Sequence, residues 1–268
     1  MSQSPRDVVR NNVKEKLARD EVVASMTVRL VRSIEIARIA KTAGFDTIYV
    51  DVEHSSLSYE TTNQICIAAL DIGIAPFVRV PSTHAEHVSR ALDGGALGVI
   101  APHVHSAAEA REVVASAKFP PFGQRSAAGP LPHLQYRSFP GGEADAAMNE
   151  ATMVVVQFET MNAVEYAEEI VAVEGVDMVL IGTNDLLADM GLTGQYEHAR
   201  VREAYSHTLA ACRKHGKHLG VGGLATSPKL VAEFVEMGAR YVSTGTDLAF
   251  LLAAATEKAK QVRETRAG

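Results

Sequence analysis

The sequence predicts a (β/α)8 barrel, in which eight parallel strands alternate with helices around one closed sheet. Two observations lead to this prediction: eight short apolar runs rich in β-branched residues, and an amphipathic segment after each of them. Parallel strands buried on both faces read as continuous apolar runs, as these do. The length of 268 residues also fits one barrel, and we expect a single domain over residues 1–268.

The expected strands are short and follow one another along nearly the whole chain. In order they are Val22–Val28, Thr47–Val52, Pro76–Val80, Gly98–Pro102, Met153–Phe158, Met178–Ile181, His218–Val221 and Tyr241–Thr244. The expected helices repeat apolar residues at i, i+3 and i+4, and they are Ser33–Thr42, Glu60–Leu70, His84–Leu92, Ala107–Ser116, Ala163–Val171, Arg200–Lys214, Pro228–Met237 and Asp247–Val262. Several helices should end at a glycine before the next strand: Gly44, Gly73, Gly95 and Gly238. A doubly wound sheet is the competing fold, but no Gly-x-Gly-x-x-Gly turn follows the first strand.

Two segments lie outside this repeat. An extra helix over Pro5–Leu17 precedes the first strand, and we expect it to cap the bottom of the barrel or to pack on a partner. The segment Phe119–Glu150 carries five prolines and is too long for a simple connection. We expect it to be irregular and to act as a lid or an interface element.

The composition excludes several classes of function. A hydrophobic content of 47% and a charged content of 22% are ordinary for a soluble protein. The net charge of −6, with no basic run, gives little support for nucleic-acid binding. No apolar stretch approaches the roughly 18 residues of a membrane span, and the N-terminus lacks an apolar signal core. Cys66 and Cys212 have no metal-type spacing and are expected to be buried thiols, so we expect a cytoplasmic protein without a membrane partner.

Polar residues gather where the strands should end. In a parallel barrel the C-terminal strand ends meet at one mouth, which is the catalytic face. The second strand is followed by Asp51, Glu53 and His54, and the later ones end at or near Arg79, His103, Gln157, Glu159, Asn184 and Asp185. The remaining turns, after the seventh and eighth strands, are rich in glycine and carry no basic residue, which argues against a phosphate site.

Glu159 and Asp185 stand one βα repeat apart, so a barrel places them on neighbouring strands. Two carboxylates with the neutral amide of Gln157 nearby suit a hard divalent ion such as Mg²⁺ or Mn²⁺. The alternative is that each carboxylate merely caps the helix that follows it, and Asp185 in particular could be an N-cap.

Arg79 and His54 are the expected partners of a substrate at this mouth. A guanidinium there can hold a carboxylate or carbonyl oxygen, although a structural salt bridge from Arg79 to Glu159 or Glu53 is an equal alternative. His54 has carboxylates close beside it in the run Asp51-Val52-Glu53-His54, and this suits a general base. His103 and His105 are expected to be wall residues or contacts of the acceptor. Five more histidines are expected to be surface or loop residues: His133, His198, His207, His215 and His218. No lysine stands at a strand end, so imine chemistry is not expected and metal-assisted chemistry on a carbonyl remains.

Taken together, these motifs resemble the HpcH/HpaI aldolases, metal-dependent class II aldolases with pyruvate-type donors. The resemblance runs from about residue 20 to about residue 260 in consistent order. It rests on Ala43-Gly44-Phe45-Asp46, Asp51-Val52-Glu53-His54, Val78-Arg79-Val80-Pro81, Gln157-Phe158-Glu159-Thr160 and Ile181-Gly182-Thr183-Asn184-Asp185-Leu186-Leu187-Ala188-Asp189-Met190-Gly191.

The resemblance implies a role for each of these residues. Glu159 and Asp185 would hold a divalent ion (Mg²⁺, Mn²⁺ or Co²⁺), and Arg79 would stabilise an enolate oxygen. His54 with Asp51 would transfer the proton through water. The donor would be contacted by Gln157 and by backbone amides around Gly182, Thr183 and Asn184. Asp93 would reach a neighbouring subunit's site, and Arg125 would lie near the acceptor.

The activity implied is cleavage or formation of 4-hydroxy-2-oxo acids from a 2-oxo acid donor, pyruvate or hydroxypyruvate, and an aldehyde. Alternatives on the same scaffold are an oxaloacetate decarboxylase, a phosphoenolpyruvate-type lyase and a non-catalytic binding barrel. The resemblance further implies a homo-oligomer, a hexamer built as a trimer of dimers, with Asp247–Val262 exchanged between subunits. Many members carry Gly-Pro-Ala-Asp where this chain has Gly182-Thr183-Asn184-Asp185, and often a bulky residue near Gly222-Gly223. The smaller residues here predict room for donors larger than pyruvate, such as hydroxypyruvate or 2-oxobutyrate.

Overall fold

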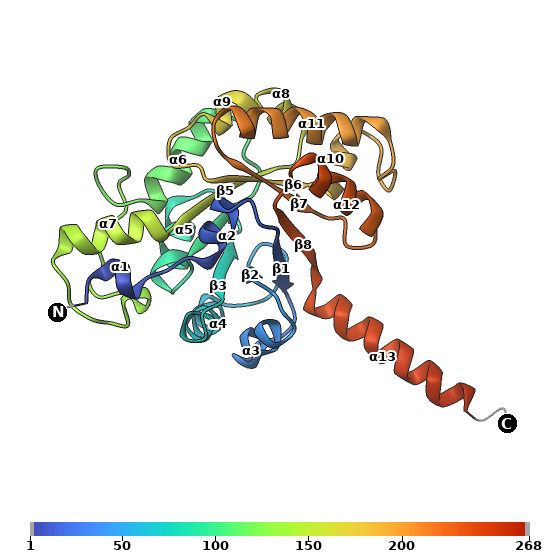
Figure 1. Cartoon of the computed structure of the whole chain (residues 1–268), viewed down its shortest axis with the longest axis horizontal. Helices are drawn as coiled ribbons and strands as arrows, with labels where there is room; N and C mark the ends of the chain where they lie inside the picture. The colour runs from blue at the N-terminus through green and yellow to red at the C-terminus, as the bar shows by residue number, and fades with distance from the viewer. Residues whose placement is uncertain (1–2, 266–268) are drawn as a thin grey trace.

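A computed structural model describes residues 3–265 and shows a closed barrel of parallel strands in the order β1-β2-β3-β4-β5-β6-β7-β8 (Figure 1). The strands are β1 Val23–Val28, β2 Thr47–Asp51, β3 Ala75–Arg79, β4 Gly98–Ala101, β5 Met153–Phe158, β6 Met178–Gly182, β7 His218–Gly222 and β8 Tyr241–Thr246. Val23 pairs with Tyr241, which closes the sheet. The predicted barrel is confirmed. The expected domain range of 1–268 includes residues 1–2 and 266–268, which lie outside the described residues.

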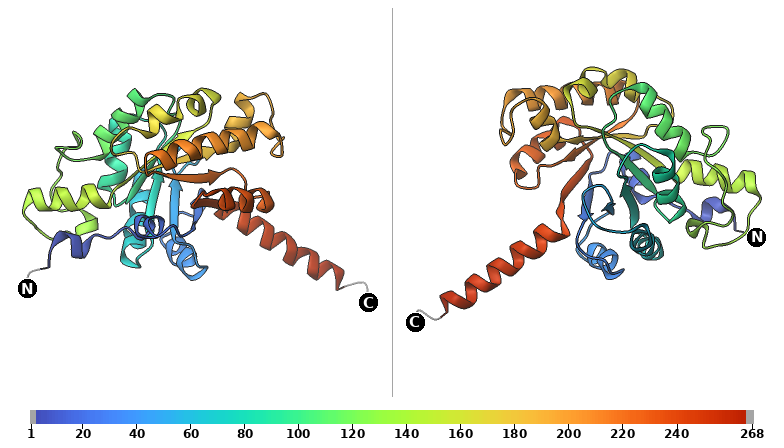
Figure 2. Two further views of the ribbon diagram at one scale, coloured as in Figure 1. Left: turned by 45° about the horizontal axis from the view of Figure 1, so that its top comes forward. Right: turned by 180° about the vertical axis from the view of Figure 1, so that it is seen from behind.

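Helices surround the barrel on the outside (Figure 2). Those that follow the strands are α3 Glu35–Thr42, α4 Tyr59–Asp71, α5 Ala85–Asp93, α6 Ala107–Ala117, α8 Met161–Glu165, α9 Ala167–Val171, α10 Thr183–Asp189, α11 Ala199–Lys214, α12 Pro228–Met237 and α13 Asp247–Glu264. Two details differ from the prediction. The helix expected after β5 is divided into α8 and α9, and the short α10 after β6 was not expected.

Alternation along the strands divides the apolar core into two layers. On β2, Ile48 and Val50 face outward and pack with the surrounding helices. Tyr49, between them, faces into the barrel and packs with Phe77 and Leu180 of other strands. The interior of the barrel is therefore filled with side chains below the mouth.

The N-terminal segment closes the bottom of the barrel. It forms two short helices, α1 Pro5–Val8 and α2 Asn12–Ala18, where one helix was expected. The reason is Asn11, whose side chain accepts hydrogen bonds from the N–H groups of Val13 and Lys14 at 3.1 and 3.3 Å and so starts a new helix. Val13 and its neighbours pack into the inner layer, which confirms the expectation of a cap on the barrel bottom.

The segment 119–150 is more regular than expected. It contains a 3-10 turn, η1 Pro132–Leu134, and the helix α7 Gly141–Ala151, which was missed because two glycines begin it and its small residues form no clear apolar face. Lys118 anchors this segment, since its Nζ donates to the carbonyls of Asn149 and Thr152 at 2.7 and 2.6 Å.

His133 was expected to be a surface or loop residue, and the surface alternative is wrong. Its side chain is buried within η1, and its Nε2 lies 2.9 Å from the carbonyl oxygen of Ala96. Burial lowers the pKa of His133 from 6.5 to about 4. The imidazole is therefore a neutral packing element that joins η1 to the start of β4.

The last helix, α13, extends away from the barrel (Figures 1 and 2). Its first residue, Asp247, is buried, whereas every described residue from Leu248 to the end of the helix is exposed. The exposed residues include Leu251 and Leu252, at 58% and 64%. Among residues 3–265, no helix combines the length and the apolar character that crossing a membrane requires.

Candidate active site

Strand alternation explains which polar residues face the barrel mouth. The inward-facing residues of four strands are Tyr49, Phe77, Val155 and Leu180. Two positions further along the same strands stand Asp51, Arg79, Gln157 and Gly182. Because inward-facing residues are two positions apart on a strand, these positions change from apolar side chains inside the barrel to two charged residues, an amide and a glycine at the strand ends.

A cavity of ≈ 260 Å³ opens at this mouth. The predicted residues that line it are His54, Arg79, Gln157, Gly182, Asn184 and Asp185. Arg29 and Tyr49 also line it, and neither was predicted. Glu159 lies beside the cavity, since Gln157 Nε2 donates to its Oε1 at 2.7 Å.

Asp51 is fully buried and serves as an acceptor for two arginines. Arg79 donates to it from Nε and Nη2, at 3.0 and 2.7 Å, and Arg29 donates from Nε at 2.5 Å. Burial alone would raise the pKa of Asp51, but the hydrogen bonds and charges of these arginines outweigh it and hold the pKa below its usual range.

The relation between Asp51 and His54 runs through the backbone. Asp51 Oδ1 accepts the backbone N–H of His54 at 3.2 Å, while the imidazole points into the mouth with its side chain 53% exposed. The ring Nε2 lies 3.8 Å from the Glu53 carboxylate. Asp51 is thus placed to shape the loop that carries His54.

Arg79 is almost fully buried and held from two sides. Besides its two bonds to Asp51, its Nη1 lies 3.1 Å from Glu53 Oε2. The alternative of a salt bridge to Glu53 is therefore observed, yet the same guanidinium lines the cavity. Burial alone would lower the pKa of Arg79, but the Asp51 carboxylate raises it, so the charge is fixed.

His103 joins two carboxylates, a role that was not expected of it. Its Nδ1 lies 2.8 Å from Glu159 Oε2 and its Nε2 lies 2.9 Å from Glu53 Oε1. Its backbone N–H also donates to Glu159 Oε2, at 2.9 Å. This geometry requires a left-handed backbone at His103, with φ of 55°, which costs about 1–3 kcal/mol in a residue other than glycine.

These contacts form one chain of charged and polar side chains across the ends of β1 to β5, which we call the charged half of the mouth. In order of contact it comprises Arg29, Asp51, Arg79, Glu53, His103 and Glu159. Glu159, at one end of it, is buried, and burial raises its pKa, to which the charges of Glu53 and Asp185 add.

The other half of the mouth, over β6 and β7, is lined by glycines, and we call it the glycine half. A Cβ at Gly182 would lie 2.9 Å from both Gln157 Nε2 and Glu159 Cγ, so no side chain fits there. Gly223 adopts a φ of +78° close to the backbone of Asn184. The Thr183 hydroxyl is turned away and donates to the Gly222 carbonyl at 2.6 Å, which leaves only the backbone of Thr183 near the cavity.

The residues at the junction of the two halves fit a hard divalent ion. Glu159 and Asp185 supply carboxylates, and Gln157 Oε1 is buried with no hydrogen-bond partner among residues 3–265. Asp185 is not an N-cap, because α10 is capped at Gly182. Burial is the main cause of the raised pKa of Glu159, and the carboxylates of Glu53 and Asp185 add to it; a bound cation would offset these negative charges. All of these donors are oxygens, which Mg²⁺ and Mn²⁺ prefer.

Asp93 and Arg125 lie together but away from this cavity. Arg125 Nη2 donates to Asp93 Oδ1 at 2.6 Å, and its guanidinium lies 4.6 Å from the centre of the Phe119 ring. Asp93 ends α5, on the side of the barrel where the strands begin, opposite the mouth. Asp93 and Arg125 therefore do not contact the mouth cavity of their own chain, and any contact with a substrate would have to be made elsewhere.

Arg29 was missed although the sequence holds a signal for it. It directly follows the last residue of β1, as the other mouth residues follow their strands. Its loop is fixed by Asp247, whose carboxylate accepts the N–H groups of Arg29, Leu30 and Val31 at 3.0, 3.0 and 2.8 Å. The beginning of α13 is thus tied to the charged half.

Residues 29–254 match the sequence model of the HpcH/HpaI aldolase/citrate lyase family, and the chain belongs to this family. The resemblance inferred from the motifs is confirmed, and with it the assignment as an aldolase, a carbon–carbon lyase.

The chain is also similar to individual aldolases of this family. A 4-hydroxy-4-methyl-2-oxoglutarate aldolase of Hapsidospora irregularis is 40% identical over 94% of this chain and 94% of its own. A hydroxypyruvate/pyruvate aldolase of Cupriavidus necator is 31% identical over 85% of this chain and 84% of its own. The crystal structure of an HpcH/HpaI aldolase from Desulfitobacterium hafniense, 33% identical, matches with a TM-score of 0.88 over 94% of this chain and 96% of that chain.

Proposed function

We propose that this aldolase is a class II enzyme that uses a divalent metal ion to cleave and form 4-hydroxy-2-oxo acids, with a pyruvate-type 2-oxo acid as donor. The observation that carries the proposal is the meeting of Asp185, Gln157 and Arg79 at one cavity, with Glu159 directly beside it. The names of relatives at 30–40% identity, aldolases for 2-oxo acids, support the substrate class.

Glu159 and Asp185 would hold the metal, with Gln157 orienting Glu159 through its amide. A divalent ion at this place would act as a Lewis acid on the donor carbonyl. Arg79 stabilises the negative charge that develops on the same oxygen, because Asp51 and Glu53 fix its guanidinium before any substrate binds.

His54 is the proposed proton carrier. In the cleavage direction it takes the proton of the 4-hydroxyl group through a water molecule, and the C3–C4 bond breaks as the carbonyl acceptor forms. The electron pair of that bond passes into the enolate of the donor, and C3 then regains a proton to give the 2-oxo acid. Asp51 contributes by fixing the backbone of His54 rather than by sharing its ring proton.

The glycine half supports a donor larger than pyruvate. Gly182, Gly222 and Gly223 line the cavity, and none of them presents a side chain to a substituent on the donor methyl. The donor carboxylate would meet the backbone amides at Thr183 and Asn184. The naming of the C. necator relative as a hydroxypyruvate/pyruvate aldolase agrees with this proposal.

The exposed helix α13 supports an assembly of several copies. Its apolar residues Leu248, Phe250, Leu251 and Leu252 are 39–64% exposed, more than an isolated chain would leave uncovered on one helix. We propose that a second copy of the chain covers this helix, as expected for a hexamer built from dimers that exchange it. Light scattering of the full chain tests this assembly, and a monomer at micromolar concentration would contradict it.

The test of the activity starts from protein freed of metal with EDTA. After Mg²⁺ is added, 4-hydroxy-2-oxo acids, including 4-hydroxy-4-methyl-2-oxoglutarate, are screened for pyruvate release by a coupled dehydrogenase. Glu159→Ala should lose turnover and Mg²⁺ binding together, whereas His54→Ala should lose turnover and keep Mg²⁺ binding. His207→Ala is the matched control, because His207 is an exposed histidine on α11.

Three outcomes would contradict parts of this proposal. Full activity in EDTA would exclude the metal, and turnover of oxaloacetate alone would favour a decarboxylase. Near-wild-type rates in His54→Ala would exclude His54 as the proton carrier. The donor is tested separately by exchange of C3 protons with deuterium, and no exchange with hydroxypyruvate would restrict the donor to pyruvate.

A further inference from the structure

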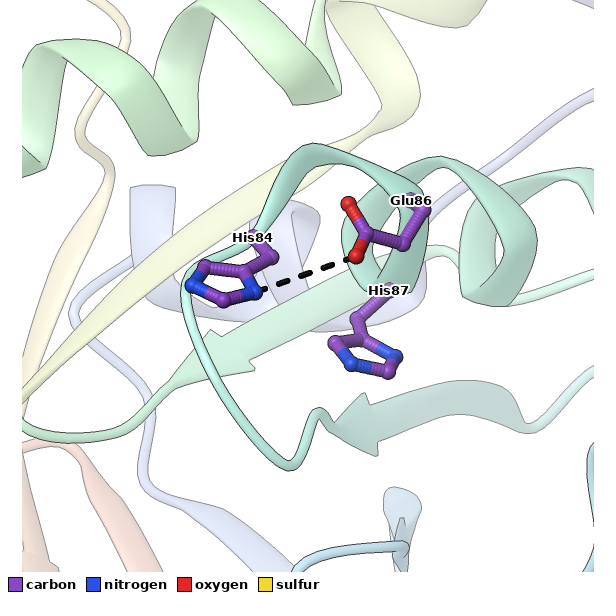
Figure 3. A group of neighbouring side chains, drawn as sticks. All are labelled: His84, Glu86 and His87. Carbon is purple, nitrogen blue, oxygen red and sulfur yellow. Dashed lines mark ion pairs between the residues drawn. The ribbon is translucent and has the colours of Figure 1, made fainter.

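A second group of metal-ligand side chains lies at the start of α5, outside the mouth. His84, Glu86 and His87 each offer one ligand atom, and these atoms all lie within 4.8 Å of one another (Figure 3). His84 is the N-cap of the helix, so the residues two and three positions later return to it within the first turn. The sequence His-x-Glu-His therefore assembles the group locally.

The histidine rings are arranged in parallel. The centroids of His84 and His87 are 6.3 Å apart with an angle of 11° between the planes, and His84 Nδ1 lies 3.8 Å from Glu86 Oε1. The side chains of His84 and Glu86 are 71% and 65% exposed, so an ion can reach them from solvent. The N-cap side chain of His84 makes no capping hydrogen bond, which leaves its ring available.

His87 is held by a partner behind it. The hydroxyl of Tyr59, on α4, lies 3.0 Å from His87 Nδ1, and the two rings stack with an angle of 7°. The guanidinium of Arg90 lies over the Tyr59 ring, 5.2 Å from its centre. With Nδ1 engaged by the hydroxyl, Nε2 of His87 has no hydrogen-bond partner among residues 3–265. Histidines that bind metals commonly have such a hydrogen-bond partner on the second nitrogen.

We propose that His84, Glu86 and His87 form a second metal site, selective for borderline transition ions such as Zn²⁺, Ni²⁺ or Co²⁺. Two imidazoles and one carboxylate make a ligand set that these ions prefer and that Mg²⁺ does not. The negative charge of Glu86 offsets the positive end of the helix, which would otherwise repel a cation. Three protein ligands leave coordination positions open to water or to another molecule.

This site is distinct from the proposed one at Glu159 and Asp185. The ligands there are oxygens only, whereas the α5 site includes two nitrogens. Because α5 follows β3, the site lies on the same end of the barrel as the mouth, but none of its residues lines the mouth cavity. The inference does not depend on the proposed catalytic metal.

Calorimetry on the full-length protein tests the proposal. The protein is freed of metal and then titrated with Ni²⁺, and separately with Zn²⁺, in an excess of Mg²⁺ that occupies any oxygen-only site. We expect one high-affinity equivalent per chain. His84→Ala and His87→Ala should each weaken it more than about tenfold, since even the loss of an outer hydrogen-bond partner costs about 10- to 100-fold. Tyr59→Phe should weaken it to a smaller extent.

Two control variants separate this site from others. His207→Ala removes an exposed histidine elsewhere and should leave the affinity unchanged, and Glu159→Ala should also leave it unchanged. Far-UV circular dichroism confirms that the α5 variants fold. Wild-type affinity in both His84→Ala and His87→Ala would overturn the proposal, and so would loss of the equivalent in Glu159→Ala alone.

Discussion

Glu159→Gln should remove the stabilisation that Mg²⁺ gives the folded protein. It should also remove the dependence of that stabilisation on pH. Burial raises the pKa of Glu159, and the charges of Glu53 and Asp185 raise it further. Between the pKa of the unfolded chain and this raised value, the folded state binds more protons. The stability of the metal-free protein therefore falls as the pH rises through the raised pKa. Mg²⁺ binds the ionised carboxylate, so its stabilising effect should grow over the same pH range.

The size of the effect follows from linkage. At a free Mg²⁺ concentration of about 100 times Kd, binding stabilises the folded state by about 2.7 kcal/mol. For 268 residues, about 2.1 cal/mol/K per residue gives an unfolding entropy of about 560 cal/mol/K. Dividing the binding free energy by the unfolding entropy predicts that Mg²⁺ raises the Tm of the wild type by about 5 °C.

Thermal unfolding with and without Mg²⁺ measures this rise at about pH 5, just above the ordinary carboxyl range, and at about pH 8, well above it. The wild type and the control His207→Ala should show the full shift at the higher pH and a smaller one at the lower pH. Glu159→Gln should show a shift below about 1 °C at both. A shift in Glu159→Gln equal to that of the wild type would refute the assignment of Glu159 as a ligand.

Three further predictions concern other parts of the fold. The fall in the pKa of His133 from 6.5 to about 4 corresponds to about 3 kcal/mol of stability that is present above pH 6.5 and lost as the pH falls toward 4. In urea unfolding at about pH 7 and about pH 4.5, His133→Gln should show a smaller acid loss than the wild type, and an equal loss would contradict this cause. Gly182→Ala should lower turnover about 100-fold with an unchanged circular dichroism spectrum, because the new Cβ displaces Glu159, and an active variant would contradict that crowding. Asp247→Asn should cost about 1–3 kcal/mol in urea unfolding, because it weakens the bonds to the loop of Arg29, and an unchanged midpoint would show that these bonds contribute nothing.

The strands could be predicted because burial on both faces leaves a mark in the sequence. Each run of β-branched residues reads as a strand with no knowledge of its neighbours, and for β1 the boundary differs by one residue, at Val23. The helix α7 carries a weaker mark: its alanines favour a helix, but it begins with two glycines after Pro140 and shows no clear apolar face. The break at Asn11 depends on one side chain that turns back onto the backbone.

The site residues could be collected from the sequence, but their partners could not. Asp51 pairs with Arg79 because the register of β2 and β3 sets them side by side, and register is a property of the closed barrel. The bridge made by His103 depends on a left-handed backbone that its residue type does not favour. Sequence reasoning therefore assigned Asp51 to His54, its neighbour in the chain, and not to its neighbour in space.

The division of the mouth into a charged half and a glycine half has a consequence for how this enzyme can diverge. In the charged half each side chain is held by the next, so a single replacement at Arg29, Asp51 or Arg79 removes a counterion from a neighbouring buried charge. These positions should therefore change together among homologues or not at all. The glycine half has no such network of charges. Although no Cβ fits at Gly182, the other positions in these loops can change one at a time, so new substrate preferences can arise there while the chemistry at the opposite wall is preserved.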